Sequence, residues 1–405
     1  MTERLVIVGG GQAAAQAVQS LRQQGFAGPI TLLCDEPYLP YQRPPLSKKY
    51  FAGELPRERL VLRPAAFYAE KGVALELNVR AEELEPASRR LRLHDGRTLD
   101  YDRLLLATGS RPRTLDVPGK ALAGVHYLRT IADVDAISAS LTTGARVLLI
   151  GAGYIGLEAA AVARQRGFDV TVLEAANRVM SRAVSVEVAS FYESVHRAAG
   201  IALHCGAAVK ALHGTTRVTD VETADGRRFP CDVVIIGVGI VPNVELAAAA
   251  GLECNNGIVV DELARTADPC IVAAGDCTNH PIPLLERRVR LESVPNAIHQ
   301  AKVAAATLVG APAAYSEVPW FWSDQYDLKL QIAGLSTGYD QVVLRGDPAE
   351  RSFAAFYLRA GQLLAVDAVN SPRVFMAGKK LVANRARIEA DVLRDAGVDL
   401  VALAG

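Results

Sequence analysis

Two short stretches of this 405-residue sequence carry glycines at spacings that suit phosphate binding. Residues 9–14 read GGGQAA and residues 151–156 read GAGYIG, and each stretch follows a short apolar run. In loops of this kind the first glycine permits a tight turn, and the second lets backbone N–H groups approach a pyrophosphate. The third small residue allows the following helix to pack closely on the strand. The sequence therefore predicts two dinucleotide sites.

An acidic residue follows each glycine loop at the distance expected for a ribose contact. Residues 30–36 end in Asp35 and Glu36, and residues 169–174 end in Glu174. Each acid lies about 20 residues beyond its loop, where a carboxylate accepts hydrogen bonds from a ribose hydroxyl. Whether Asp35 or Glu36 makes this contact stays open. The alternative, that the small residues only tighten a strand-to-helix turn, is disfavoured because the acids and the surrounding order both repeat.

The elements that would position these residues form a duplicated unit. Each copy runs through an apolar strand, a glycine loop, a helix, an acid-ended strand, an Asp-Gly hairpin and a second apolar strand. The order predicts two α/β nucleotide-binding domains with parallel sheets. The helices are expected to end near residues 24 and 166, the hairpins to turn at residues 95–96 and 225–226, and the strands after them to open at Asp102 and Asp232.

Length and composition agree with a multidomain globular chain. The chain exceeds the size at which a single core stops growing, so two or three domains are expected. Lys plus Arg and Asp plus Glu number 44 each, which argues against general nucleic-acid binding. No apolar stretch approaches the length of a membrane span. The six cysteines show no metal-binding spacing, so we expect no metal site, reduced thiols and a cytoplasmic location.

Three further segments offer groups to a bound nucleotide. Residues 36–54 are rich in proline, which forbids regular structure and predicts an extended strip that carries Lys48 toward a ring or a phosphate. A strand leads to Gly275 and Asp276, where a carboxylate can accept a hydrogen bond from a sugar-alcohol chain. A helix is expected to start near Pro295, with its N-terminus toward a polar group.

Five motifs give the chain a family resemblance. The chain resembles the FAD-dependent ferredoxin reductases of bacterial oxygenase systems, the putidaredoxin reductase-like family, in RPPLSK, ATGSRPR, TADPCIVAAGDC, LESVPNA and PWFWSDQYDLKLQ. The resemblance covers essentially the whole chain, and PWFWSDQYDLKLQ is its most specific part. It implies a glutathione-reductase-like α/β fold with two Rossmann-type domains and a C-terminal α+β domain. The implied limits are 1–110 and 244–320 for an FAD-binding domain in two segments, 111–243 for an inserted NAD-binding domain, and 321–405 for the C-terminal domain.

The resemblance also implies contacts with FAD. Arg43 and Lys48 would lie beside the flavin, and the Trp322 ring would stack there and exclude water. The alternatives are that Lys48 only solvates a turn, that Trp322 is a core aromatic, and that Arg43 is a surface cation. The implied FAD contacts are Gly9, Gly11, Ala13, Ala14, Asp35, Glu36, Arg43, Lys48, Ala81, Thr108, Gly109, Arg129, Gly275, Asp276, Val294 and Trp322.

A second set of implied contacts concerns the nicotinamide nucleotide. Glu158 is either a nicotinamide contact or a group that complements the dipole of its helix. Arg178 and Arg182 could accommodate the 2′-phosphate of NADPH, and Arg182 could instead be an ordinary surface cation. Glu174 would repel that phosphate, so NADH is favoured. The implied NAD contacts are Gly151, Gly153, Tyr154, Ile155, Gly156, Glu158, Glu174, Arg182 and Gly239.

The implied reaction is hydride transfer from NADH to FAD without a covalent protein intermediate, supported by Lys48, Glu158 and Trp322. Disulfide reductases of this fold pass the electrons to a cysteine pair with a lowered thiol pKa. Residues 38–50 contain no cysteine, so an outside one-electron acceptor is expected. The family's partner is an acidic [2Fe–2S] ferredoxin that docks transiently. The ferredoxin passes electrons to an oxygenase, for which a haem monooxygenase is the first candidate.

An acidic partner requires a basic docking face. Other functions remain open: reduction of rubredoxin or another small redox protein, and a flavin-binding signalling protein of apoptosis-inducing-factor type that responds to NADH. A membrane-bound NADH:quinone reductase is disfavoured because the C-terminal residues lack a basic amphipathic anchor. The candidate docking cations, which could also be a plain solvated face, are Arg287, Arg288 and Arg290 in one run and Lys379, Lys380, Arg385 and Arg387 in another.

Overall fold

The structure, a computed structural model, describes residues 3–405 and divides the chain into two compact units. The first unit takes in the chain up to Gln42, Arg57–Arg111 and Val241–Pro319. The second takes in Arg43–Pro56, Pro112–Ile240 and Trp320–Gly405. Each unit is therefore assembled from segments that lie far apart in the sequence.

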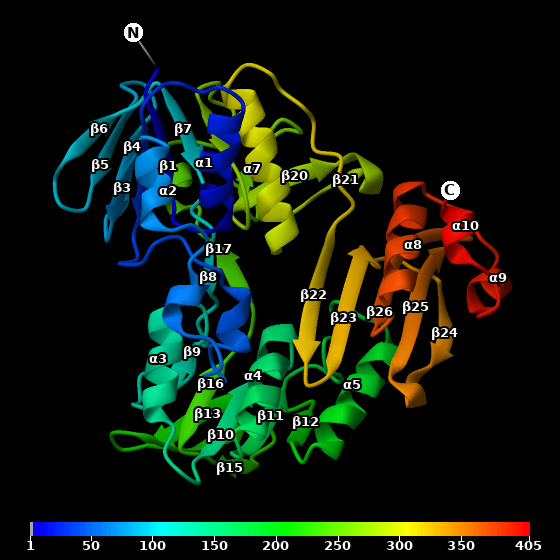
Figure 1. Cartoon of the computed structure of the whole chain (residues 1–405). Helices are drawn as coiled ribbons and strands as arrows, with labels where there is room; N and C mark the ends of the chain where they lie inside the picture. The colour runs from blue at the N-terminus through cyan, green and yellow to red at the C-terminus, as the bar shows by residue number, and fades with distance from the viewer. Residues whose placement is uncertain (1–2) are drawn as a thin grey trace. The chain divides into compact units, whose positions relative to one another are not determined.

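A parallel sheet with the strand order β19-β7-β1-β2-β3 is the centre of the first unit. Its inner strands are apolar runs that are buried along most of their length, because a parallel sheet is covered on both faces. The helices α1 (Gln12–Gln23) and α7 (Val294–Leu308) lie side by side against it and share one alanine-rich core with it (Figure 1). The strands are β1 (Leu5–Val8), β2 (Ile30–Cys34), β3 (Val73–Leu77), β7 (Arg103–Leu106) and β19 (Ile271–Ala273).

Smaller elements complete the first unit. The antiparallel sheet β4-β5-β6 contains the predicted hairpin at Asp95-Gly96, and a second small sheet has the order β18-β20-β21. The bounds are η2 (Arg57–Leu60), α2 (Ala65–Glu70), β4 (Ala81–Glu85), β5 (Arg90–Leu93), β6 (Thr98–Asp100), α6 (Glu245–Ala249), β18 (Ile258–Val259), β20 (Thr278–Ile282), η3 (Pro283–Leu285) and β21 (Arg287–Val289). Two short strands, β8 (Ser110–Pro112) and β17 (Ile240–Pro242), pair with each other, and each contains a sequence boundary between the two units.

The second unit contains another parallel sheet, in the order β12-β11-β10-β16-β9. A small antiparallel sheet, β13-β14-β15, carries the predicted turn at residues 225–226. The strands are β9 (Val125–Tyr127), β10 (Arg146–Ile150), β11 (Asp169–Glu174), β12 (Ala202–Cys205), β13 (Val209–Gly214), β14 (Val218–Thr223), β15 (Arg228–Pro230) and β16 (Val233–Ile236). The helices are η1 (Pro44–Ser47), α3 (Ile131–Ser140), α4 (Tyr154–Gln165) and α5 (Val186–Ala198).

The C-terminal segment adds an antiparallel sheet, β22-β23-β26-β25-β24, to the second unit. The helix α8 packs against β26 and β23 of this sheet (Figure 1). The bounds are β22 (Trp320–Gln325), β23 (Leu328–Gly334), β24 (Gln341–Asp347), η4 (Pro348–Glu350), β25 (Ser352–Arg359), β26 (Gln362–Val369), α8 (Pro372–Ala383), α9 (Ala390–Arg394) and α10 (Leu400–Ala404). The expected α+β character of this segment and the expected fold class are confirmed.

The duplication predicted from the sequence extends to individual contacts. In the first copy the backbone N–H of Arg4 donates to Asp102 Oδ2 at 2.7 Å, and the guanidinium Nε donates to the same oxygen at 3.1 Å. In the second copy Arg146 makes the same two bonds to Asp232 Oδ2, at 2.8 and 3.0 Å. Both pairs clamp the first strand of a copy to the strand that follows its hairpin, so the two aspartates have the same structural role.

The proline-rich stretch differs in part from its prediction. Pro44–Ser47 form a 3-10 turn rather than an extended strip, because proline is well suited to the first positions of a helical turn. Leu46 and Ser47 are buried in this turn, and Lys48 follows it directly.

Across residues 3–405, no helix is both long enough and apolar enough to span a bilayer.

Candidate cofactor-binding site

The second glycine of each loop faces open space. A Cβ added at Gly11 or at Gly153 would meet no atom within 4 Å. Each of these glycines is the N-cap of the following helix, and among residues 3–405 no side chain caps α1 or α4 there. Three other helices have their first N–H groups bonded by Thr130, Ser185 and Ser293. The first turns of α1 and α4 therefore keep N–H donors and room for an anionic ligand, which fits the pyrophosphate of a dinucleotide.

The first glycine of each loop is required by the fold itself. Gly9 and Gly151 have φ angles of 120° and 102°, which side chains with a Cβ rarely adopt. An added Cβ would also come within 2.1 Å of the Ala107 carbonyl oxygen in the first copy and 2.4 Å of the Gly237 oxygen in the second. The glycine therefore lets each loop pass over the end of the neighbouring strand.

The third position differs between the copies, as the sequence already showed. A Cβ on Gly156 would lie 2.2 Å from the Gly151 carbonyl oxygen, so only glycine fits there. In the first copy Ala14 occupies the matching place and is completely buried in the core between α1 and the sheet. The two loops thus share their spacing to the helix and differ only in the residue type at the third position.

Glu174 holds the second glycine loop through backbone hydrogen bonds. Its Oε2 accepts the N–H of Ala152 at 2.6 Å, and its Oε1 accepts the N–H of Ala176 at 2.8 Å. These bonds fix the carboxylate beside the glycine loop, where the sequence predicted a ribose contact. The remaining lone pairs of the carboxylate suit two ribose hydroxyls.

The acids of the first copy do not occupy the position of Glu174. Strand register places Glu174 opposite Gly151, whereas the residue opposite Gly9 is Cys34. Cys34 lies under the first loop, since a Cβ on Gly10 would come within 2.7 Å of its sulfur. Asp35 is exposed, and Glu36, which is half-buried, accepts the Tyr41 hydroxyl at 2.6 Å. A spacing count could not detect this shift, because both helices have 12 residues but the turn that follows is longer in the first copy, at residues 24–29, than in the second, at residues 166–168.

Several predicted FAD contacts of the first unit come together around the exit of β19. A Cβ at Gly275 would lie 3.3 Å from the Ala13 Cβ of α1. The Gly275 N–H donates to Gln300 Oε1 at 2.7 Å, and the Ser110 hydroxyl donates to Asp276 at 2.9 Å. The other predicted contacts in this unit are Thr108, whose hydroxyl donates to the Asn243 carbonyl at 2.6 Å, Gly109, Ala81 at the start of β4, and Val294 at the start of α7.

Four predicted FAD contacts belong to the second unit instead: Arg43, Lys48, Arg129 and Trp322. Arg43 Nη1 donates to the Arg129 carbonyl at 2.9 Å, so these two residues are neighbours. The Trp322 ring is half-buried and lies 5.8 Å from the Trp320 ring. Their contacts with a flavin stay a prediction.

Lys48 and Glu158 form a nearly buried ion pair. Lys48 Nζ lies 2.8 Å from Glu158 Oε2, and their side chains are 17% and 4% exposed. The Ser47 hydroxyl donates to the same oxygen at 2.5 Å, and the Ser323 hydroxyl donates to Oε1 at 2.7 Å. Removal of one partner would leave an uncompensated charge in this place, which costs about 3–5 kcal/mol in buried pairs.

Sequence reasoning selected Lys48 and Glu158 but missed the two serines. Ser47 stands inside RPPLSK and Ser323 inside PWFWSDQYDLKLQ, so the motifs contained both residues. A serine has no distinctive chemistry by itself, and only the fold brings these two to one carboxylate.

The structure also places the predicted NAD contacts beyond the loop. Ile155 is exposed, with 44% of its surface accessible, whereas the Tyr154 ring packs inward against Phe321 at 4.9 Å. Arg182 is exposed, and its Nη2 lies 3.6 Å from the place of a Cβ on Gly239, so these two residues adjoin.

The second arginine of this region is already engaged. Arg178 donates to the carbonyls of Val184 and Ser181, at 2.7 and 2.8 Å, and closes the turn between β11 and α5. A guanidinium held in this way serves the fold, so Arg178 is a poor candidate for a 2′-phosphate of NADPH.

The cysteines lack the features of a redox-active pair. All six are free within residues 3–405. Burial and the charges of Asp35 and Glu36 raise the pKa of the Cys34 thiol to about 12, and burial raises that of Cys205 to about 11. Redox-active cysteines need the opposite shift, because the thiolate is the reactive form. In the part of the chain described, no group of three His, Cys, Asp or Glu residues could hold a metal ion.

The predicted docking cations are only partly available. Arg288 donates to the carbonyls of Val260 and Asn279, and Arg290 pairs with Glu292. Arg387 donates to the Ala360 carbonyl at 2.7 Å, and Lys379 lies over the Trp320 ring. Structural bonds thus occupy several of these cations, and docking through either run stays a prediction.

Comparisons with known proteins agree with this geometry. The pyridine nucleotide-disulphide oxidoreductase family matches residues 3–301, and the family described as reductase C-terminal matches residues 320–404. The chain is 46% identical to a probable ferredoxin reductase of Castellaniella defragrans, over 99% of both chains. It is 43% identical to putidaredoxin reductase of Pseudomonas putida, over 98% of this chain and 96% of the relative.

A solved structure of the covalent putidaredoxin reductase–putidaredoxin complex superposes on the chain with a TM-score of 0.96 at 42% identity. The superposition covers 99% of this chain and 99% of the solved chain. Two family matches and full-length relatives of this similarity leave one assignment. The chain belongs to the pyridine nucleotide-disulphide oxidoreductases, in the branch of ferredoxin reductases that resembles putidaredoxin reductase.

Proposed function

We propose that this protein is an NADH:ferredoxin oxidoreductase that carries FAD and supplies electrons to an oxygenase through a [2Fe–2S] ferredoxin. The main supporting observation is the pair of glycine loops. Each loop leads to a helix N-terminus that no side chain caps, and its second glycine faces open space. The names of the relatives support the same activity, since they are ferredoxin reductases and putidaredoxin reductase. The raised thiol pKa values of Cys34 and Cys205 support an outside acceptor, and reduced thiols would suit a cytoplasmic location.

The chain's own residues would bind and orient the two nucleotides. The loop around Gly11 and the first turn of α1 would hold the FAD pyrophosphate, and the loop around Gly153 with α4 would hold that of NADH. Glu174 would bind the NADH ribose and disfavour the 2′-phosphate of NADPH. FAD, when bound, accepts a hydride and releases its electrons singly, which suits a one-electron iron–sulfur partner. Lys48 and Trp322 would border the flavin and exclude water.

An anaerobic NADH titration of the purified protein tests this function. The protein is expected to be yellow, to release FAD on denaturation, and to lose its 450 nm absorption within seconds of NADH addition. NADPH should act at least about tenfold less efficiently because Glu174 repels the additional phosphate. A colourless protein, or one bleached equally well by both nucleotides, contradicts the assignment.

The same titration separates the second candidate function. A signalling flavoprotein of apoptosis-inducing-factor type would bleach slowly and keep a long-lived charge-transfer absorption. Fast bleaching without such a species favours the reductase.

A further inference from the structure

The strand β22 reaches the Lys48–Glu158 pair through residues that the proposed function leaves unexplained. Ser323 donates to Glu158 Oε1 at 2.7 Å, and Gln325 Nε2 donates to Ser323 Oγ at 3.1 Å. Beyond it, Gln325 Oε1 lies 2.8 Å from His196 Nε2 of α5. Ser323, Gln325 and His196 are all at most 1% exposed. A buried chain of hydrogen bonds therefore runs from α5 through β22 to the carboxylate on α4.

The neighbouring groups determine which atom donates and which accepts in each of these hydrogen bonds. At one end the Glu158 carboxylate only accepts, so the single proton of Ser323 must point to it. Ser323 Oγ is then free to accept, and it receives the Gln325 amide N–H. The same amide nitrogen faces the Met180 sulfur at 4.0 Å, an atom that cannot donate. Both neighbours thus require the amide nitrogen of Gln325 on this side and its oxygen toward His196.

His196 completes the chain as a donor. Because Gln325 Oε1 accepts, the hydrogen of the imidazole lies on Nε2. The other nitrogen, Nδ1, is buried and has no hydrogen-bond partner among residues 3–405. Burial lowers the pKa of His196, which agrees with a neutral ring. The Tyr326 ring lies 5.2 Å from the His196 ring.

We propose that Ser323, Gln325 and His196, together with Ser47, are positioning residues that fix the Glu158 carboxylate and through it Lys48. The proposal rests on the proposed function, because it takes Lys48 to border the flavin. Glu158 is almost completely enclosed, and Lys48 is the more exposed member of the pair. The ammonium group can therefore hold one place beside a cofactor only if the carboxylate beneath it does not move. The hydroxyl groups of Ser47 and Ser323, one on each carboxylate oxygen, provide this restraint.

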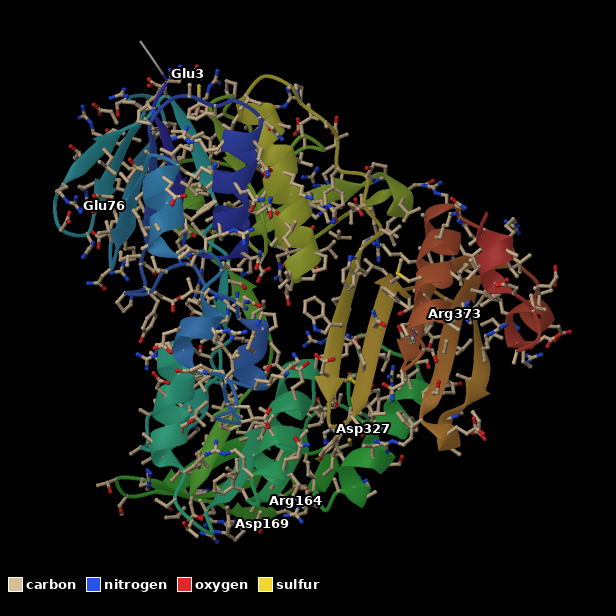
Figure 2. All side chains as sticks on the ribbon, in the orientation of Figure 1. Glu3, Glu76, Arg164, Asp169, Asp327 and Arg373 are labelled. Atoms are coloured by element: carbon tan, nitrogen blue, oxygen red, sulfur yellow. The ribbon has the colours of Figure 1, made fainter. Side chains whose placement is uncertain are left out.

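The hydrogen-bonded residues of β22 explain part of the most specific sequence motif. Ser323 and Gln325 alternate with Trp322 and Asp324 along PWFWSDQYDLKLQ, so they face the side opposite the tryptophan. The strand ends at Gln325, and the turn to β23 carries Asp327 (Figure 2). Asp327 pairs with Arg351 on the surface. One face of this strand thus supports the ion pair, and the other carries the predicted flavin contact.

Two substitutions and one control test the proposal in the FAD-loaded, full-length protein. Ser323→Ala removes one donor to Glu158 and adds no atoms. Gln325→Glu keeps the shape but places an acceptor beside Ser323, so the hydroxyl proton is shared between two carboxylates. Ser352→Ala is the control, because Ser352 is an exposed serine of the same sheet that bonds to Asn370 and Ser371.

The limiting rate of flavin bleaching by NADH is expected to fall about tenfold in Ser323→Ala, with the NAD⁺ dissociation constant changed less than twofold. Gln325→Glu should lose more at pH 8 than at pH 6, because the protonated carboxyl can again donate to Ser323. Ser352→Ala should match the wild type at both pH values. A purely structural role would lower flavin content or melting temperature but would not give the pH-dependent loss.

A crystal structure of Ser323→Ala supplies a readout that is independent of turnover. The Glu158 carboxylate is expected to leave its place and the contact of 2.8 Å with Lys48 to lengthen or break. Wild-type bleaching rates in both variants, or an unmoved pair in the crystal, overturn the proposal while the proposed function stands. A wild-type protein that NADH does not bleach overturns the proposed function itself. If Ser323→Ala fails to retain FAD, the pH dependence of Gln325→Glu decides.

Discussion

At the scale of single residues, Gly151 and Gly153 show one residue type used for two physical reasons. Gly151 has a φ of 102° and no room for a Cβ, whereas Gly153 has a φ of −75° and open space beside it. The first glycine is therefore needed by the fold, and the second is needed only when a ligand approaches.

This difference predicts opposite effects of the same substitution. Gly153→Ala should leave the free energy of unfolding unchanged within about 0.5 kcal/mol and weaken NADH binding about tenfold, because the added methyl group occupies the pyrophosphate side. Gly151→Ala should destabilise the protein by about 3 kcal/mol through strain and the contact with Gly237. Urea unfolding and NAD⁺ calorimetry measure both effects. Equal losses of stability in the two variants would contradict the assignment.

Single residues also mark the limit of what the sequence could predict. The glycine spacing identified both loops, because glycine is required there by sterics that any chain obeys. The equivalence of Glu174 with Cys34 could not be found by counting, since it depends on strand register. The role of Ser323 was equally hidden, because its partner Glu158 lies far away in the sequence.

At the scale of elements, a buried carboxyl group links β26 to β25 and to the start of α5. Tyr357 on β25 donates its hydroxyl proton to Asp367 on β26 and accepts the Ser185 N–H at 2.9 Å. Asp367 Oδ1 has no partner within residues 3–405, and the same holds for the buried hydroxyls of Tyr154 and Tyr192. Burial raises the pKa of Asp367 to about 8, with the Tyr357 bond opposing this shift.

The raised pKa predicts a dependence of stability on pH. The unfolded carboxyl titrates near pH 4 and the folded one near pH 8, so the folded state binds the additional proton between these values. The stabilisation that Asp367 gives by binding this proton is fully present below pH 4. As the pH rises to 8 it is lost, and the free energy of unfolding falls by up to about 1.4 kcal/mol per pH unit. Asp367→Asn cannot titrate and should flatten this part of the curve, gaining stability relative to wild type toward pH 8.

Urea unfolding of both proteins at pH 5, 6.5 and 8 measures the difference. The gap between variant and wild type should change steadily in favour of the variant as the pH rises. Parallel curves across this range would show that Asp367 is ionised in the folded protein.

Elements with a strong local signal were predicted well. The strands, helices and Asp-Gly hairpins of the duplicated unit are confirmed, because apolar periodicity and turn residues act within a few positions. The stretch at residues 36–54 was predicted less well, since Pro44 and Pro45 begin a 3-10 turn instead of an extended strip. The strand order of the C-terminal sheet depends on pairings between distant segments, and no local pattern reveals those.

At the scale of the whole molecule, family membership and the fold class are confirmed by the comparisons. The domain limits at residues 110, 243 and 320, the individual cofactor contacts and the docking surface stay predictions. The cofactor contacts and the docking surface depend on how the cofactors and a partner protein meet the chain, which its own folded contacts do not determine. The central claim is that electrons leave through an outside acceptor, because residues 3–405 hold no cysteine pair with the features of a redox-active one.

The most direct measurement of this claim is NADH-dependent cytochrome c reduction with and without a [2Fe–2S] ferredoxin, at low and at physiological salt. The account predicts slow reduction by the protein alone, at least tenfold stimulation by a suitable ferredoxin from a panel that includes putidaredoxin, and weaker stimulation at the higher salt. Blocking accessible thiols with iodoacetamide beforehand should change none of these rates. Equal rates with and without every ferredoxin tested, or loss of activity on thiol blocking, would contradict it.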